Sequence, residues 1–182
     1  MSVDLLEAAN AAAGQSPHAS DIEMPSSSMI RAAKLSSDGR YRYALWRTWN
    51  TGLPTVLFLG LNPSTADAEG DDPTVRRCIG FAKRWGYGTL GIGNLFALRT
   101  SSPPVLRRST FPIGPLNDRW LRQLAAGADL IVGAWGAAGT WMDRDRQVRN
   151  MIGPMMCLGS TRSGQPRHPL YVPRDARLRQ LR

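Results

Sequence analysis

Four short apolar runs recur along the chain, and each ends at a glycine. They are residues 55–60, 89–93, 129–133 and 155–159. Stretches that can be helical separate them, and this alternation predicts a parallel sheet covered by helices on both faces. In such sheets ligands bind in the crevice outside the carboxyl ends of the strands. The polar residues that follow each run are therefore the first candidates for a site.

The segments between the runs differ in how well they suit a helix. Residues 73–85 have apolar positions at helical spacing, Asp72 can cap their amino end, and Gly86 ends them. Residues 115–126 return to the same spacing, and residues 140–151 are predicted to form a third covering helix. Residues 97–114 contain several prolines, which predicts a long loop with one short helical turn.

An antiparallel hairpin is predicted ahead of the first parallel strand. Asp38-Gly39 is a strong hairpin turn signal, and it separates residues 33–36 from residues 41–49. The alternating pattern of residues 41–49 predicts an amphipathic strand at an edge of the sheet or packed as a lid. Its role is expected to be structural.

Length and composition indicate one domain, residues 29–182, behind a leader, residues 1–28, whose Ala, Ser and Pro content favours disorder. No apolar run approaches the roughly 20 residues of a membrane span, and the start does not suit a secretory signal. We expect a cytoplasmic monomer. Cys78 and Cys157 fit neither a disulfide framework nor a metal motif, so both are expected in the core. No metal and no cofactor is expected.

The net charge is +9, and only Lys34 and Lys83 among the 23 basic residues are lysines. Residues 144–182 carry nine arginines against two aspartates. Arginine holds phosphate oxygens in pairs, so the sequence predicts a nucleic-acid partner, with Arg162 and Arg167 among its contacts. The alternative is that arginine usage reflects genomic base composition and an ordinary solvated surface.

Polar side chains follow the first apolar run. Asn62 precedes a proline, which favours a tight turn with its carboxamide in the crevice, where it can hold a water or a polar base edge. It can equally cap the turn. Ser64, Thr65 and Asp67 add hydroxyl and carboxylate groups nearby, and Ser64 and Thr65 are expected nucleic-acid contacts. Each of the three can instead cap the next helix.

Two further candidates follow later runs. Asn94 ends a buried run, and its amide offers a donor and an acceptor to one planar partner, as a nucleobase edge requires. Phe96 can supply a stacking face or belong to the core. His168 lies between prolines in a loop and can donate a hydrogen bond to developing negative charge. The nucleophile elbow, the phosphate-binding loop and the dinucleotide-binding turn are all absent from the sequence.

The order of these motifs resembles the uracil-DNA glycosylase superfamily. The resemblance runs over residues 55–172 and rests on Gly60-Leu-Asn-Pro, on the strand that ends in Asn94, on Trp135-Gly136 and on His168-Pro169. It implies a three-layer α/β/α sandwich with a short parallel sheet, and an enzyme that flips a damaged base out of DNA and cuts its N-glycosidic bond.

The resemblance also implies roles for particular residues. Asn62 would position the attacking water, Asn94 would read the flipped base, and His168 would stabilise the departing base. A wedge entering the duplex would come from Leu170 or Tyr171, and a stacking aromatic from Phe81 or Phe96.

The sequence departs from that superfamily in two places. Asn62 stands where the uracil-specific branch has an aspartate, and Leu170 stands where a serine follows His-Pro. A closer resemblance is to a bacterial and phage family called domain of unknown function 1643, which has no established activity. It rests on Asn62–Asp67, Asp71–Thr74, Asn94–Ala97, Ala134–Gly136 and His168–Tyr171.

The expected function is therefore that of a nucleic-acid-binding, DNA-repair-type glycosylase that hydrolyses the N-glycosidic bond of a damaged, mismatched or modified base. Asn62 or Asp67 would orient the water. Two alternatives stay open: a non-catalytic nucleic-acid-binding module, and an enzyme acting on a free modified nucleotide. The acidic residues Asp67, Asp71 and Asp72 indicate a chemistry that the glycosylase comparison does not supply.

Overall fold

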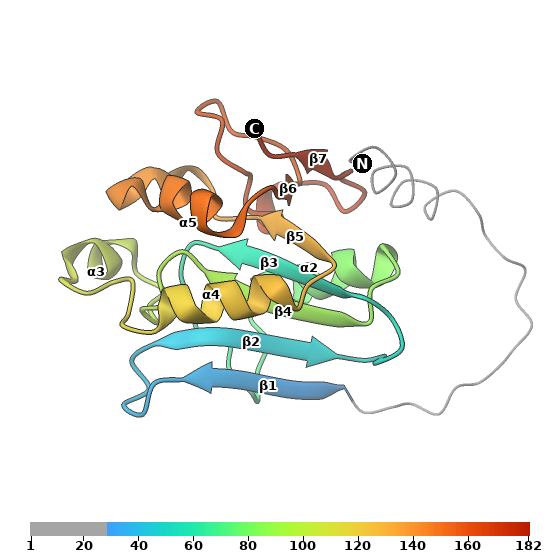
Figure 1. Cartoon of the computed structure of the whole chain (residues 1–182), viewed down its shortest axis with the longest axis horizontal. Coiled ribbons are helices and arrows are strands. Elements are labelled where there is room, and N and C mark those ends of the chain that lie inside the picture. The colour runs from blue at the N-terminus through green and yellow to red at the C-terminus, as the bar shows by residue number, and fades with distance from the viewer. Residues whose placement is uncertain (1–28) are drawn as a thin grey trace, which may run out of the picture.

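A computed structural model describes residues 29–182, and within them one mixed sheet has the strand order β1-β2-β4-β3-β5-β6-β7 (Figure 1). The leader expected at residues 1–28 lies outside the described residues. The strands are β1 Ile30–Leu35, β2 Arg42–Thr48, β3 Thr55–Gly60, β4 Thr89–Asn94, β5 Leu130–Gly133, β6 Met156–Cys157 and β7 Arg179–Gln180. The helices are α2 Pro73–Arg84, α3 Pro103–Arg108, α4 Asn117–Ala126 and α5 Arg144–Ile152, with 3₁₀ turns at Ala137–Asp143 and Pro169–Tyr171.

The four predicted parallel strands form the middle of the sheet. β4, β3, β5 and β6 are parallel neighbours, with Gly60 opposite Asn94 and Leu59 opposite Gly133. Their carboxyl ends therefore meet at one edge, as the alternating pattern predicts. β7, which the sequence pattern did not predict, closes the far side by pairing antiparallel with β6.

The predicted hairpin is confirmed, but its place in the sheet differs from the expectation. β1 pairs antiparallel with β2, and β2 in turn pairs antiparallel with β4, Trp46 lying opposite Gly91. Residues 41–49 are thus neither an edge strand nor a lid, and β1 is the edge. Because β2 has neighbours on both sides and helices near both faces, even Arg42 and Arg47 are buried.

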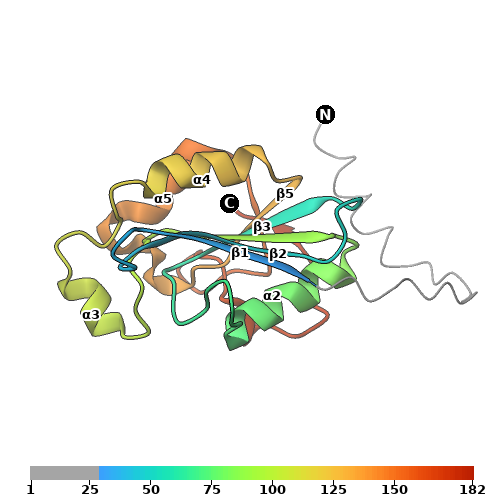
Figure 2. The ribbon, with the colours of Figure 1, turned by 90° about the horizontal axis from the view of Figure 1, so that it is seen from below.

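Helices cover both faces of the sheet (Figure 2). On one face, α2 packs its buried side chains against β3 and β4, in a core that includes Val75, Phe81 and Phe58. On the other face, Leu121 of α4 and Val148 of α5 share a core with Leu57. Both cysteines are free and buried, as expected.

The helix boundaries follow local chemistry. Asp72 caps α2 by accepting a hydrogen bond from the Val75 amide at 2.8 Å, and the helix ends before Gly86, whose φ is +80°. The long loop contains only α3, as predicted. The third covering helix begins later than expected, because Met142 and Asp143 adopt positive φ and interrupt it.

Two arginines buried on β2 hold the irregular loop between β3 and α2. Arg47 is fully buried, and its Nε donates to Asp71 Oδ1 at 2.7 Å while its Nη2 donates to the Asp67 and Gly70 carbonyls. Arg42 donates to the Ala66 carbonyl at 2.6 Å. The loop has no regular structure of its own, so these bonds determine where its side chains lie.

Asp71→Asn should destabilise the protein strongly, because it leaves the Arg47 guanidinium buried without its carboxylate. Breaking such a pair costs about 3–5 kcal/mol of unfolding free energy, which urea denaturation measures. Asp143→Asn is the matched control, since the Asp143–Arg146 pair is exposed and should be worth less than about 1 kcal/mol. Equal losses in the two variants would contradict this account of the loop.

Candidate functional site

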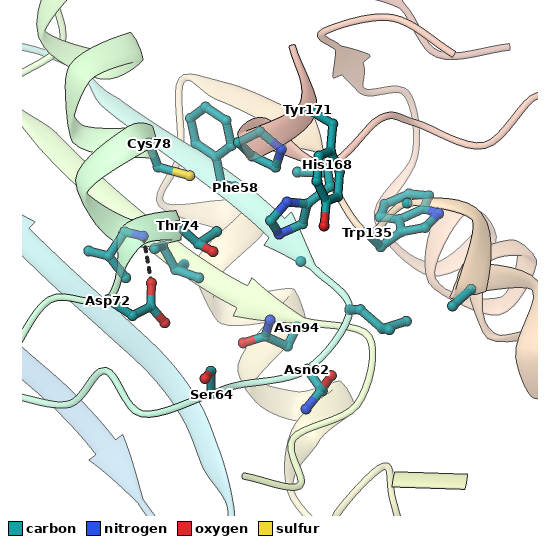
Figure 3. Close-up of a pocket in the computed structure, with 18 of the residues that line it drawn as sticks. Phe58, Asn62, Ser64, Asp72, Thr74, Cys78, Asn94, Trp135, His168 and Tyr171 are labelled. Carbon is teal, nitrogen blue, oxygen red and sulfur yellow. Dashed lines mark hydrogen bonds between the residues drawn. The ribbon is translucent and has the colours of Figure 1, made fainter. Parts of the chain in front are cut away.

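A cavity of about 700 Å³ opens at the carboxyl ends of β3, β4 and β5 (Figure 3). Its walls come from the loop after β3, the start of α2, the turn after β5 and the loop that carries His168. Asn62, Asn94 and His168 all line it. The prediction that these three side chains share one cavity is therefore confirmed, although more than a hundred residues separate the first from the last.

Asn94 is oriented by an arginine. Its Oδ1 accepts a hydrogen bond from Arg42 Nη2 at 3.3 Å, and because a guanidinium can only donate, the amide nitrogen must be the other atom. That Nδ2 has no hydrogen-bond partner within residues 29–182. Gly60 leaves room for it, since a Cβ there would lie 2.7 Å from Nδ2. Asn94 thus offers the cavity a donor, while its acceptor is already shared.

Asn62 joins two loops. Its Nδ2 donates to the Thr100 carbonyl at 2.6 Å and to its neighbour's carbonyl, that of Pro63, at 3.1 Å. The amide nitrogen therefore holds the turn, which was one of the two roles that the sequence left open. The Oδ1 atom accepts no bond from the described residues, so it is the part of Asn62 that can serve a ligand or a water.

The loop that carries His168 is held by the turn after β5. The Gly136 amide donates to the Pro166 carbonyl at 2.9 Å, and Trp135 Nε1 donates to Gln165 Oε1 at 2.7 Å. The Nδ1 atom of His168 accepts from the Leu170 amide at 3.3 Å, so the proton of the neutral ring lies on Nε2. Burial lowers the pKa of His168 below its ordinary value, against a weaker opposing attraction to Asp72. The neutral ring is a hydrogen-bond donor into the cavity.

Arg42 and Asp72 also line the cavity, although neither was among the site residues predicted from the sequence. Arg42 is 3% exposed, and burial lowers its pKa to about 10, which leaves it charged at neutral pH. Asp72 presents its carboxylate beside Thr74 at the start of α2 (Figure 3). The only available signal for Arg42 was an arginine in a strand whose other residues are mostly apolar or aromatic.

Several predicted site residues lie elsewhere. The Asp67 carboxylate turns back to accept from the Glu69 and Gly70 amides, which lower its pKa, and it does not line the cavity. Phe96 and Phe81 are core residues, packed against Trp141 and Trp85. Phe58 of β3 is the phenylalanine that lines the cavity, since Phe81 points from α2 into the core and Phe96 lies beyond the end of β4.

The proposed nucleic-acid contacts divide in the same way. Ser64, Arg167 and Tyr171 line the cavity, while Thr65, Arg162 and Leu170 are exposed residues outside its walls. Tyr171 is 73% exposed and its ring lies 5.6 Å from that of His168.

Two further observations concern metal binding and membrane spanning. Among the described residues, no group of three or more His, Cys, Asp or Glu is placed to hold a metal, and none of the described helices is long and apolar enough to cross a membrane.

The model of the family described as "Protein of unknown function (DUF1643)" matches residues 42–170. The chain belongs to this family. The match begins at Arg42 and ends at Leu170, so it spans the loops that build the cavity. No curated protein and no solved structure matches the chain.

The lowered pKa of His168 predicts how its ring titrates. The midpoint in the folded chain should lie below that of the same residue in urea, because burial disfavours the imidazolium. The neutral ring's contribution to stability is therefore complete above the unfolded pKa, about 6.5, and is lost as the pH falls from there to the folded pKa. NMR titration of the ring protons in both states measures the two midpoints. A folded midpoint at or above the unfolded one would contradict a buried, neutral ring that donates through Nε2.

Proposed function

We propose that this protein is a glycosylase-like enzyme that binds a base of nucleic acid in the cavity and hydrolyses its N-glycosidic bond. The observation that carries the proposal is the convergence of Asn62, Asn94 and His168 at one strand edge. The wider likeness to uracil-DNA glycosylases, including a three-layer sandwich, belongs to this proposal. It is supported by the parallel core of the sheet and by helices on both of its faces.

The chemistry needs a group that stabilises the departing base. In the hydrolysis the bond between C1′ and the base nitrogen breaks, its electron pair leaves with the base, and water adds to C1′. Nε2–H of His168 would donate to the base oxygen on which negative charge develops, and a buried site strengthens that interaction. Asn94 Nδ2 would donate to a second acceptor on the base edge.

Water activation requires an acceptor in the cavity. Asp67, one of the two expected candidates, is turned into its own loop. Asn62 Oδ1 and the Asp72 carboxylate remain, and Asp72 is the one carboxylate among the described residues that lines the cavity. We therefore assign water orientation to Asn62 and proton acceptance to Asp72. Phe58, Trp135 and Tyr171 would enclose the flat faces of the base.

A second hollow suggests where the phosphate backbone would lie. It has a volume of about 440 Å³ and no carboxylate among its lining residues, which include the four arginines Arg76, Arg77, Arg84 and Arg174. None of the four is paired with a carboxylate in the described part of the chain. Arg77 Nε donates to the carbonyl of Pro169, which lines the main cavity, so the two hollows adjoin. We place the backbone here instead of at Arg162.

Base release tests the proposed reaction. Oligonucleotides that contain uracil, mismatched bases or hypermodified bases are incubated with excess protein, and the released base is measured. With any substrate that the wild type cleaves, His168→Ala should slow release by at least ~10²-fold, the scale for one lost catalytic group.

The control for that experiment is Arg122→Ala on the exposed side of α4, which should leave the rate unchanged. If the protein binds oligonucleotides but releases a base from none of them, the enzyme proposal is wrong and a non-catalytic binding module is favoured. Binding that does not depend on the length of the strand would favour the free modified nucleotide as substrate.

Salt dependence tests the arginine hollow. The logarithm of the affinity for duplex DNA should fall linearly with the logarithm of the salt concentration, with a slope of about 0.9 per phosphate contact. Arg76→Gln combined with Arg84→Gln should therefore make the slope shallower by roughly 2, while Arg162→Gln should not change it. Fluorescence anisotropy over a series of salt concentrations would measure both. A slope that changes only in the Arg162 variant would show that the phosphate backbone contacts Arg162 and not the arginine hollow.

A further inference from the structure

Arg42 differs from the other buried arginines. Three arginines are buried among residues 29–182, and two of them have a carboxylate partner: Arg47 pairs with Asp71 and Arg144 with Asp118. Arg42 has none within ion-pair distance. Its guanidinium contacts two neutral oxygens, the Ala66 carbonyl and Asn94 Oδ1, and its Nε has no partner among the described residues.

An unpaired buried charge is expensive, because a cation loses its hydration without gaining a counter-ion. Burial lowers the pKa of Arg42, yet only to about 10, so the side chain does not escape the cost by losing its proton. Asp72 attracts it from across the same cavity, but its Oδ1 already accepts from the Val75 amide. The positive charge therefore faces the cavity without a direct partner.

Other donors line the same cavity. Asn94 Nδ2 is turned away from Arg42 and has no partner within the described chain, and the Thr74 hydroxyl lines the cavity in the first turn of α2. A cation, an amide donor and a hydroxyl together suit a group with several oxygen acceptors and a negative charge.

We propose that the cavity holds an anionic group of its substrate, a phosphate or a carboxylate, directly against Arg42. The inference rests on the proposed function only in taking this cavity as the substrate site. It adds that the substrate carries a charge inside the cavity, separate from any backbone phosphates over the arginine hollow. Two sources supply this chemistry: the phosphate of a nucleotide and an acidic substituent on a modified base.

The first measurement uses inorganic phosphate and the full-length chain, by isothermal titration calorimetry. Wild type should bind phosphate, and Arg42→Met should weaken binding by at least ~10-fold, since the charged donor is lost. Arg122→Met, the same replacement at an exposed position, should leave the affinity unchanged. Phosphate binding that is absent in wild type, or equal in Arg42→Met, overturns the proposal.

A second variant covers the case in which Arg42→Met fails to fold. Asn94→Asp places a carboxylate oxygen where Oδ1 already lies 3.3 Å from Arg42 Nη2. This internal partner should keep the melting temperature at or above that of wild type and abolish phosphate binding. A folded Asn94→Asp protein that binds phosphate as wild type does also overturns the proposal.

Two further ligands distinguish the sources. If dUMP binds at least ~10-fold more tightly than deoxyuridine, and only when Arg42 is present, the anion is the nucleotide phosphate. If 5-carboxy-2′-deoxyuridine gains the same advantage instead, the anion belongs to the base. Phosphate binding through Arg42 without any base release would support this subsite and defeat the glycosylase proposal. If Arg42→Met instead leaves both kcat and KM of base release unchanged, the glycosylase proposal is supported and the anionic subsite is ruled out.

Discussion

The site depends on two arginines that β2 buries beneath an irregular loop. Residues 61–72 connect β3 to α2, and their carbonyls at Ala66, Asp67 and Gly70 accept from Arg42 and Arg47. Together with the bonds that Asn62 and Asp67 make, these contacts offset the conformational entropy that opposes order in a loop of this length. The loop in turn presents Asn62 and Asp72 to the cavity. Stability and site geometry therefore both depend on β2. Arg47 is paired with the carboxylate of Asp71, whereas Arg42 has no carboxylate within ion-pair distance among the described residues.

The cavity offers both donors and acceptors. Donors come from Arg42, Asn94, Thr74 and the neutral ring of His168, while Asn62 and Asp72 supply the acceptors. Phe58 and Trp135 provide apolar walls between them. A flat ligand with oxygen acceptors and negative charge matches this distribution better than an apolar or cationic one. Membership of the family of unknown function does not indicate a reaction. The function therefore has to be inferred from the residues of the site.

Much of the local structure could be predicted, because short-range patterns decide it. The cap at Asp72, the stop at Gly86 and the Asp-Gly hairpin require only neighbouring residues, and all three are present in the fold. The break before α5 was missed, because it depends on a distant contact: Arg144 is buried with its Nε donating to the Leu95 carbonyl at 2.9 Å. The two-residue strand β7 was also beyond periodicity, which needs a longer run to be recognised.

For the site, the sequence by itself determined that Asn62, Asn94 and His168 would meet. Each follows a strand of a parallel sheet or a loop leading back to it, and parallel strands end at a common edge whatever their packing. Only the tertiary structure decided which aromatic, which carboxylate and which cation would join them. Phe58 on β3 faces the cavity, whereas Phe96 lies beyond the end of β4, where the chain leaves the sheet and packs into the core beneath α4 and α5. The choice of Asp72 over Asp67, and the burial of Arg42, follow from β2 inserting beside β4, a pairing between residues about fifty positions apart that no local pattern records.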